Sequence, residues 1–584
     1  MNRAESFNKL KSFLDYHIDQ KNTECVTVLP LRCGLGKSTY IRHRISDTLR
    51  NGTSGLIVIT DALDRMDEYL NSDDLLGQFL RRNRSKIAML TSKTLSEELK
   101  TQWRKPVLIM TTQRYFNLTR AEIIEYTQYS GGKRDKIIFD EKPYLIEQHQ
   151  IDIGTFNDVD TALHSAIDDT VDAAEKAWII EQWENLRNQI ESVISNYENM
   201  NQNQMETWHY NHNDAMTDDD DRFMRFINKY RLKLNQFDNS TYGNILAIKQ
   251  LLYEGATFTS KKLSSGEYRK YFTIAMDNSD KLLDLGADVF VLDGTADINP
   301  EYNLHYVTMI DCREFLIPLT NLTINLVDIS TSKNQLCKPG GHSQGIIRCI
   351  KDYLLTAPED TNIIFTYKGI EDQFRKDFKY VDHFGNIKGS NQFREATSIA
   401  QVGLNRYPDI AYKQIVYLTK LLDSDYGNRA VTKWIRESTV ENVMSLSLLA
   451  DIEQNLFRSK LRNVDCSEPI TYTIFLNTAA YSNLIELIRN RYENDLGATI
   501  NIVPRPVGYQ ILKSKSRRTE AKTKVQIVLE WLEQQPKGRE FSPVDLRSEC
   551  GLTKDQYKSV KKSKAVCELL AKMSTDTLGL YIVR

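Results

Sequence analysis

The feature that most constrains the fold is a glycine-rich loop at residues 30–39, PLRCGLGKST. The apolar run CVTVL at residues 25–29 precedes it, and the segment YIRHRI, with the spacing of a helix start, follows it. A strand, a glycine-rich loop and a helix in this order are typical of a phosphate-binding loop. Glycines let several backbone N–H groups point at one anion, and the helix N-terminus adds the positive end of its dipole. The sequence therefore predicts a parallel α/β domain with a phosphate site at this loop.

The loop has the short form of the motif, because Leu31 stands where the first glycine belongs. We expect Lys37 to reach the β- and γ-phosphates of a nucleotide and the Ser38 hydroxyl to bind Mg²⁺. The candidate nucleotide-binding residues are Gly34, Gly36, Lys37, Ser38 and Thr39. The alternative interpretation is a surface turn with an incidental lysine.

Apolar runs alternate with helical stretches after the loop. The runs at residues 55–60, 87–91, 106–112 and 136–141 are typical of strands, and the stretch 63–80 of a helix. This alternation predicts a doubly wound parallel sheet, in which ligands bind at the carboxyl ends of the strands. Three of the runs end in polar residues, namely Thr60, Thr112 and the pair Asp140-Glu141.

The acidic pair is the second chemical feature. An apolar strand ending in Asp-Glu, about a hundred residues after a phosphate loop, suits an NTPase. Asp140 would hold Mg²⁺, and Glu141 would orient or deprotonate the attacking water. Alone, the pair would be read as an acidic strand end in a loop.

The pattern changes between residues 143 and 285, which we interpret as a mainly helical insertion. Residues 257–276 alternate on both sides of SSGE at 264–267 and predict a hairpin. Four consecutive aspartates at 218–221 suggest a metal site, but a run of like charges is more often a solvated loop.

The α/β pattern resumes at residues 287–296, 323–329 and 362–367. Two further polar segments follow at 383–391 and 454–462. Arg458 and Arg462 in the latter are four residues apart and would share a face on a helix.

The order of these stretches resembles a superfamily 2 helicase, with two RecA-like domains and the nucleotide between them. The stretches that resemble its motifs I to VI are, in order, residues 30–38, 138–141, 293–296, 363–367, 385–391 and 454–462. DGTA at 293–296 and GLNRYP at 403–408 lean toward the branch containing the iron–sulphur helicases, although residues 143–285 contain no cysteine. Motif VI departs from the pattern, because Phe457 replaces a glycine and Arg462 comes one position late.

The resemblance implies ATP and Mg²⁺ as cofactors and assigns further roles to single residues. Gln454, Arg458 and Arg462 would be catalytic, and Gly389 would contact the nucleotide. Thr60 and Thr112 would contact nucleic acid.

The last 74 residues differ in charge from the rest. Residues 511–584 hold 16 Lys/Arg against 9 Asp/Glu, a net charge of +7, whereas the whole chain has −2. Helical stretches at 525–532, after Ser542 and after Thr553, with a terminal strand at 578–583, fit a winged helix. Its basic helix would face DNA through Lys558, Lys561 and Lys562. The alternative is a protein-binding winged helix with a solvated basic face.

These observations predict an α/β chain with two RecA-like parallel-sheet domains, a mainly helical insertion and a small C-terminal winged helix. The predicted boundaries are 1–297 for the first domain with its insertion at 143–285, 298–510 for the second, and 511–584 for the basic linker and winged helix.

Composition limits the setting. The eight cysteines form no C-x-x-C pair, which predicts a reducing cytoplasm and argues against a disulfide framework or a structural zinc site. No apolar run approaches the ~20 residues of a membrane span, so we expect no membrane partner.

Two function classes follow. The first is an ATP-dependent helicase or translocase on single-stranded or forked DNA, or on RNA, in replication, repair or defence of a bacterium, phage or mobile element. The second is a non-translocating nucleic-acid-dependent NTPase, a loader or switch that recruits protein partners through the insertion or the winged helix. A fused nuclease finds no support, because no H-N-H or spaced D…E-x-K constellation stands out.

Overall fold

The computed structural model shows two compact units, Met1–Cys337 with Pro358–Pro504, and Lys338–Ala357 with Arg505–Arg584, and each is described by itself. The described residues are 3–52, 54–91, 94–167, 171–196, 204–208, 218–234, 241–254, 256–262, 267–338, 340–356, 362–385, 393–421, 437–463, 465–510, 524–561, 563–571, 573–575 and 580–582.

The first sheet carries the phosphate loop. Its seven main strands pair in parallel in the order β12-β1-β11-β6-β2-β4-β3, and β5 (Gln128–Tyr129) adds antiparallel to the start of β6. Their bounds are β12 Val307–Met309, β1 Val26–Leu29, β11 Asp288–Leu292, β6 Gly132–Asp140, β2 Gly55–Thr60, β4 Val107–Thr111 and β3 Ile87–Leu90. The central strands are buried along their length, as in sheets covered on both faces.

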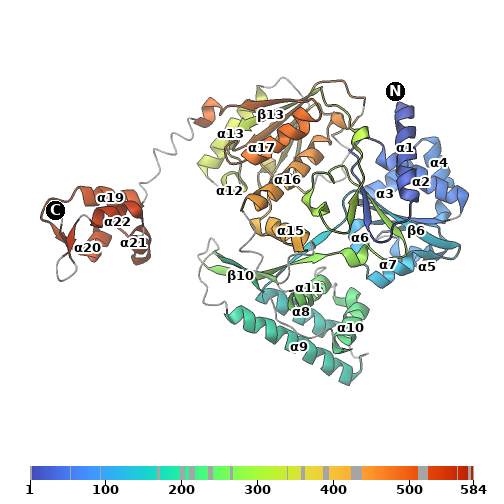
Figure 1. Cartoon of the computed structure of the whole chain (residues 1–584), viewed down its shortest axis with the longest axis horizontal. Coiled ribbons are helices and arrows are strands. Elements are labelled where there is room, and N and C mark those ends of the chain that lie inside the picture. The colour runs from blue at the N-terminus through green and yellow to red at the C-terminus, as the bar shows by residue number, and fades with distance from the viewer. Residues whose placement is uncertain are drawn as a thin grey trace. The chain divides into compact units, whose positions relative to one another are not determined.

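Helices connect these strands (Figure 1). They are α2 Lys37–Asn51, α3 Leu63–Asn71, α4 Leu75–Arg82, α5 Leu95–Thr101, α6 Thr112–Phe116 and α7 Arg120–Tyr126, and α1 Arg3–Asp19 precedes the first strand. The helix predicted at 63–80 is two helices, because the Asp74 carboxylate accepts a hydrogen bond from the Gly77 N–H and caps a new start.

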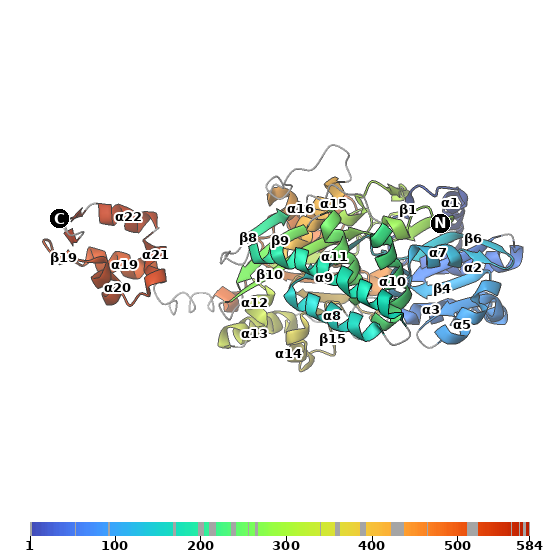
Figure 2. The same cartoon turned by 90° about the horizontal axis from the view of Figure 1, so that it is seen from below.

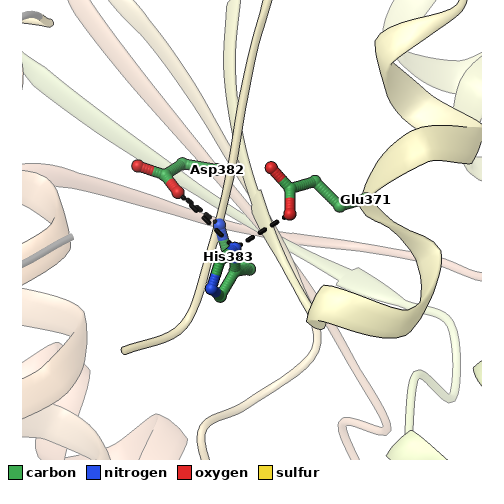
Figure 3. A group of neighbouring side chains, drawn as sticks. All are labelled: Glu371, Asp382 and His383. Carbon is green, nitrogen blue, oxygen red and sulfur yellow. Dashed lines mark hydrogen bonds and ion pairs between the residues drawn. The ribbon is translucent and has the colours of Figure 1, made fainter. Parts of the chain in front are cut away.

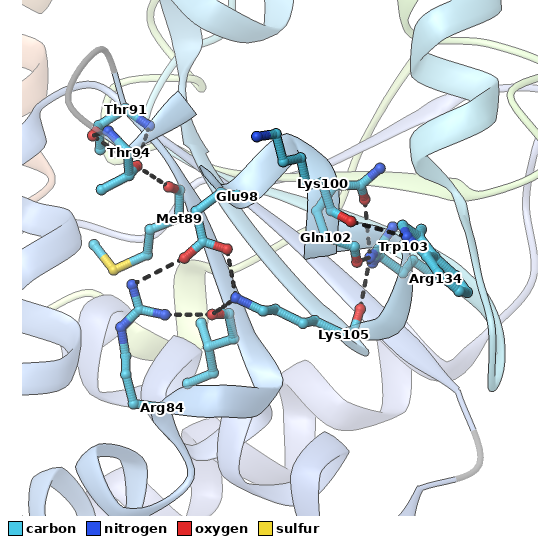
Figure 4. A network of polar contacts seen from close by, with 11 residues as sticks. Arg84, Met89, Thr91, Thr94, Glu98, Lys100, Gln102, Trp103, Lys105 and Arg134 are labelled. Atoms are coloured by element: carbon cyan, nitrogen blue, oxygen red, sulfur yellow. Dashed lines mark hydrogen bonds and ion pairs between the residues drawn. The ribbon is translucent and has the colours of Figure 1, made fainter. Parts of the chain in front are cut away.

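A buried arginine of β6, Arg134, lies in a polar network with residues that precede strands β3 and β4 (Figure 4). Arg134 is fully buried, and its guanidinium donates to the carbonyls of Gln102 and Lys105, each at 2.6 Å. Burial lowers the pKa of Arg134 to about 10. Glu98 pairs with Lys105 at 2.5 Å and with Arg84 at 3.4 Å in the same network. The arginine has protein partners, so its role is structural.

The second sheet is also parallel, with the order β15-β14-β16-β17-β13-β18. Its strands are β15 Tyr380–His383, β14 Asn362–Thr366, β16 Ser398–Val402, β17 Ile470–Leu476, β13 Leu322–Asp328 and β18 Thr499–Val503, and its helices include α12 Lys333–Leu336, α14 Glu371–Arg375, α15 Asp409–Leu421, α16 Glu437–Leu456 and α17 Ser482–Ile488. Two parallel α/β domains confirm the predicted fold class. The first sheet extends past residue 297, because β12 pairs with β1.

The insertion has a hydrophobic core of its own, and its helices face the viewer in Figure 2. It consists of β7 Ile146–Ile151, α8 Ile153–Ala166, α9 Ala173–Asn196, β8 Gln204–Trp208, α10 Asp218–Leu234, α11 Thr241–Glu254, β9 Ala256–Lys262 and β10 Tyr268–Asp277. Its four strands pair antiparallel in the order β7-β10-β9-β8, so the predicted hairpin is present. The aspartates at 218–221 begin α10, where the helix dipole favours carboxylates, and do not form a loop.

The second unit combines helices with a small antiparallel sheet. Its elements are α13 Gly341–Leu355, α19 Lys524–Glu533, β19 Glu540–Phe541, α20 Pro543–Glu549, α21 Lys554–Val560, α22 Lys564–Ala571, β20 Ser574–Thr575 and β21 Tyr581–Ile582. The strands form an antiparallel sheet in the order β19-β21-β20. Ser542 and Thr553 cap α20 and α21 with capping boxes, as the sequence predicted. The basic stretch after Thr553 is two helices instead of one.

None of the helices in the described part of the chain combines the length and apolar character that a membrane span requires.

Candidate nucleotide-binding site

The glycine-rich loop connects β1 to α2, as the sequence predicts. Gly34 and Gly36 have φ angles of 91° and 99°, in the left-handed region that favours glycine. A Cβ atom on Gly34 would lie 1.9 Å from the carbonyl oxygen of Arg462. The loop therefore packs directly against the second α/β domain, and only glycine fits at residue 34.

The loop and the acidic pair meet at the carboxyl edge of the first sheet. The Lys37 ammonium is buried, 3.7 Å from the Glu141 Oε1 atom. The Ser38 hydroxyl donates to the Asp140 Oδ2 atom at 3.4 Å. Thr39 lies in the first turn of α2 with an exposed side chain. The structure thus brings together the four side chains predicted to handle phosphate, Mg²⁺ and water.

Glu141 has an unusual backbone and a perturbed charge. Its φ angle of 103° is rare for a residue with a side chain, and such strain clusters at functional sites. Burial would raise the pKa of Glu141, but Lys37, Arg65 and Arg458 lower it to about 2. Glu141 is therefore ionised at neutral pH and can accept a hydrogen bond from water.

Asp293, in the stretch resembling motif III, lies beside this pair. Burial and the nearby Glu141 raise the pKa of the Asp293 carboxyl group. It accepts hydrogen bonds from the Thr295 hydroxyl at 3.0 Å and from the Tyr302 hydroxyl at 2.8 Å. Next to it, a Cβ atom on Gly294 would lie 3.0 Å from the carbonyl oxygen of Leu31. The residues that follow β11 therefore pack against the backbone of the phosphate loop.

The second domain contributes Arg458. Its guanidinium interacts electrostatically with Cys33 and Glu141, and burial lowers the pKa of Arg458. Arg458 and Arg462 do not share a helix face, because α16 ends at Leu456 and residues 460–462 form a short 3₁₀ turn. The shared face that a helix would give the two arginines therefore does not form. Arg462 contributes its backbone carbonyl beside Gly34.

Two more residues were predicted to act at the nucleotide, Gln454 and Gly389. Gln454 is half-buried near the end of α16. Gly389 lies outside the described residues.

Arg32 was not predicted and is a central part of the site. It is 4% exposed, its Nε atom lies 3.4 Å from the Glu453 carboxylate, and its guanidinium carbon lies 5.7 Å from the centre of the Phe457 ring. The aromatic departure at Phe457, where motif VI usually has glycine, thus packs against the loop arginine. The sequence marked Phe457 as a departure from motif VI, but only the structure shows that its ring meets Arg32.

The same glutamate anchors a chain of ion pairs between the two domains. Arg491 pairs with Glu453 at 3.0 Å and with Asp297 at 2.5 Å. Asp297 lies between strands β11 and β12 of the first sheet, whereas Glu453 and Arg491 belong to the second domain. Arg32, Glu453, Arg491 and Asp297 therefore connect the phosphate loop to both domains.

Buried polar atoms without hydrogen-bond partners test whether a nucleotide fits. Among the described residues these atoms include Lys37 Nζ, Arg458 Nε, Asp140 Oδ1 and the three guanidinium nitrogens of Arg32. Such atoms are rare in native proteins because leaving them unpaired is costly. Cations around a glycine loop fit phosphate groups, and a free carboxylate oxygen beside Ser38 fits Mg²⁺.

A small pocket with a volume of about 30 Å³ lies beside the loop. Its walls are apolar and aromatic with a few polar groups, and are formed by Arg32, Cys33, Leu35, Phe315, Ile317, Pro318, Leu319, Asn321, Phe457, Leu461, Arg462, Asn463 and Cys466. This volume is room for about two water molecules, so the candidate nucleotide site rests on the loop and its buried polar atoms and not on this pocket.

The residues predicted to contact nucleic acid differ in exposure. Thr60 is 0% and Thr112 7% exposed, and the Thr112 hydroxyl donates to the Thr60 carbonyl at 3.3 Å. Their side chains are therefore closed to ligands in this structure. Lys558 and Lys561 are exposed on and just after α21. Lys562 lies outside the described residues.

A second group of metal-type ligands lies at the edge of the second sheet. Figure 3 shows Glu371 and Asp382 on either side of His383. The His383 Nδ1 atom lies 2.8 Å from Glu371, and Arg375 also pairs with Glu371. Because Glu371 already has these partners, we interpret the group as an ion-pair network.

No protein-family model matches the sequence, and a search of curated proteins found no match. Among solved structures, S. tokodaii Xpd4 is 12% identical, covers 85% of this chain and 99% of that chain, and has a TM-score of 0.44. T4 UvsW is 9% identical, covers 85% of this chain and 76% of that chain, and has a TM-score of 0.20. Because both scores are low, we base the functional assignment on the geometry of the site.

Proposed function

We propose that this chain is an ATP-dependent helicase or translocase that acts on nucleic acid, with single-stranded or forked DNA as its preferred substrate. The observation that carries the proposal is a set of buried nitrogen atoms on cationic side chains that have no hydrogen-bond partner, namely Lys37 Nζ, Arg458 Nε and the guanidinium nitrogens of Arg32. Arg32 and Lys37 belong to the loop with the chemistry of a phosphate site, and Arg458 comes from the other α/β domain.

Each residue of the site has a separate role in ATP hydrolysis. Lys37 binds the terminal phosphates, and Ser38 and Asp140 hold Mg²⁺, which neutralises phosphate charge when it is bound. Glu141 orients the attacking water. Arg458 stabilises negative charge on the transferred phosphoryl group from the opposite domain.

The position of this site between two domains supports a motor function. The loop backbone at Gly34 contacts Arg462, and the ion pairs of Glu453 join the domains beside it. Binding and hydrolysis of ATP would change these contacts. The two domains would then bind a nucleic-acid strand more or less tightly at each step. Most contacts to that strand would be to phosphates and independent of sequence.

ATP turnover and strand displacement test the proposal together. Turnover should be measured without nucleic acid and with single-stranded DNA, duplex DNA, forked DNA and RNA, and strand displacement on the forked substrate. We expect the highest turnover and displacement with single-stranded or forked DNA. Stimulated turnover without displacement would indicate the alternative, a loader or switch. No turnover under any condition would contradict both.

A further inference from the structure

Arg32 of the phosphate loop contacts two side chains at the end of α16. Phe457 follows this helix directly, and its N–H donates to the Glu453 carbonyl at 3.1 Å, so the two residues are one helical turn apart. The Arg32 Nε atom lies 3.4 Å from Glu453 Oε1, and the Arg32 guanidinium carbon lies 5.7 Å from the centre of the Phe457 ring. All three side chains are buried, so water screens these contacts little. We refer to these three residues as the Arg32 cluster.

Glu453 has other partners for its charge. Arg491 donates to both carboxylate oxygens, from Nε to Oε2 at 3.0 Å and from Nη2 to Oε1 at 3.1 Å. The Tyr492 hydroxyl also donates to Oε2, at 3.3 Å. Arg32 adds only the longer ion pair, and none of its three guanidinium nitrogens makes a hydrogen bond within the described part of the chain. The charge of Glu453 is therefore compensated without Arg32, and the burial of Arg32 has to be explained in another way.

The next residue along the chain is Arg458, the arginine that we assign to the transition state. It lies in the turn after α16, where its backbone N–H donates to the Asn455 carbonyl at 3.1 Å. Its Nε atom is buried and has no hydrogen-bond partner among the described residues. Its guanidinium interacts electrostatically with Cys33 and Glu141 of the first domain. No hydrogen bond of Nε fixes this side chain, so its position depends on where the turn lies.

The phosphate loop contacts this turn at both ends. Arg32 contacts Phe457 at its start. At its end, a Cβ atom on Gly34 would lie 1.9 Å from the carbonyl oxygen of Arg462. The segment 457–462 is thus seated on the loop at two points, with Arg458 between them. Only the contact at its start is made by side chains, so only that one can be altered without changing the backbone of the loop.

We propose that Arg32 is a positioning residue for Arg458. Its contacts with Glu453 and Phe457 hold the start of the turn against the phosphate loop, so that Arg458 faces the phosphoryl group that the same loop binds. This inference rests on the proposed function and names the contact that aligns the two domains for hydrolysis. Alignment matters because a displacement of about 1 Å can lower a rate about 10²-fold. The ring of Phe457 thereby has a role at a position where motif VI usually has glycine.

Arg32→Lys tests this role because it keeps the positive charge but loses the planar group that contacts a ring and a carboxylate. In the full chain with a single-stranded oligonucleotide, kcat should fall roughly 10-fold to 100-fold, and the KM for ATP should change less than about twofold. The affinity for ADP with aluminium fluoride, which mimics the transferred phosphoryl group, should fall by a similar factor. The affinity for a non-hydrolysable ATP analogue should stay within about twofold of the wild-type value.

The same substitution in an Arg458→Ala background separates positioning from a direct role. If Arg32 acts through Arg458, Arg32→Lys should lower the single-turnover rate of Arg458→Ala by less than about twofold. The double variant should likewise bind ADP with aluminium fluoride as Arg458→Ala alone does. A direct contact of Arg32 with the nucleotide would instead give the full loss in both backgrounds.

Two further variants complete the test. Phe457→Leu keeps an apolar side chain but removes the ring, so kcat should fall by a smaller factor because the ion pair of Arg32 with Glu453 remains. It also takes the place of Arg32→Lys in both backgrounds if circular dichroism shows that Arg32→Lys does not fold. Arg394→Lys makes the same replacement at an exposed arginine of the second domain, and it should behave as wild type.

The outcomes distinguish this inference from the proposed function. A wild type that hydrolyses no ATP contradicts the proposed function. An active wild type with unchanged kcat in Arg32→Lys and Phe457→Leu contradicts only the positioning by Arg32. Losses that are equal with and without Arg458 would show that Arg32 acts independently of Arg458, and would also overturn it. A wild-type kcat in Arg458→Ala would contradict the role of Arg458 and this inference together.

Discussion

The cations around the phosphate loop and the lysines of α21 are both assigned to phosphate groups, but they differ in burial. Lys37 and Arg32 are 6% and 4% exposed, whereas Lys558 and Lys561 lie open to solvent. Buried charges interact strongly because little water screens them, and exposed charges interact weakly and lose more of their effect in salt. Replacing one of the buried cations should therefore change the rate of ATP hydrolysis strongly. Replacing one of the exposed lysines should change the affinity for nucleic acid only slightly, so several must be replaced together.

Removal of Arg458 should have the largest effect on catalysis. Arg458→Ala should lower kcat by a factor of roughly 10³–10⁵, the range for arginines that stabilise phosphoryl transfer. The KM for ATP should change little, because the stabilisation applies to the transition state. Arg394→Ala, which removes an exposed arginine of the same domain, is the matched control. A raised KM with unchanged kcat would make Arg458 a binding or structural residue.

Removal of Lys37 should have the next largest effect. Lys37→Ala should lower ATP turnover by a factor on the order of 10³ and weaken nucleotide binding, while the circular dichroism spectrum stays unchanged. Lys86→Ala, at an exposed lysine, should leave both unchanged. Glu141→Gln should instead keep nucleotide binding and lose hydrolysis. Wild-type turnover in Lys37→Ala or Glu141→Gln would contradict the site assignment.

The buried ion pairs between the domains should matter for stability. Glu453→Gln leaves Arg32 and Arg491 without their shared partner, and breaking a buried pair costs about 3–5 kcal/mol. Urea denaturation followed by fluorescence should show this loss. Lys460→Ala breaks the exposed pair with Glu468 and should cost at most about 1 kcal/mol. Equal losses in the free energy of unfolding would contradict the prediction that the buried ion pairs stabilise the chain more than the exposed pair does.

The exposed lysines should give the smallest effect for each residue. Replacing Lys558, Lys561 and Lys562 together by glutamine should flatten the slope of log DNA affinity against log salt by about two to three units. Turnover without DNA should stay unchanged. An unchanged salt slope would argue against DNA binding by α21, and loss of a protein partner in the same variant would make this unit an interaction module.

Local sequence determined the phosphate loop, the strands and the caps. The run before Gly34 has the apolar pattern of a buried strand, and Ser542 and Thr553 have the side chains that cap helices. These signals extend over a few residues, so each is readable without knowledge of the rest of the chain.

Tertiary structure decided which charges share the site. Arg65 meets Glu141 from 76 residues away, and Arg32 meets Glu453 across the two domains. It also decided that α16 ends before Arg458 and that Thr60 is buried. These features depend on sheet order and domain packing, because the energy of a buried charge is set by the partners that the fold brings to it and not by its neighbours in the chain.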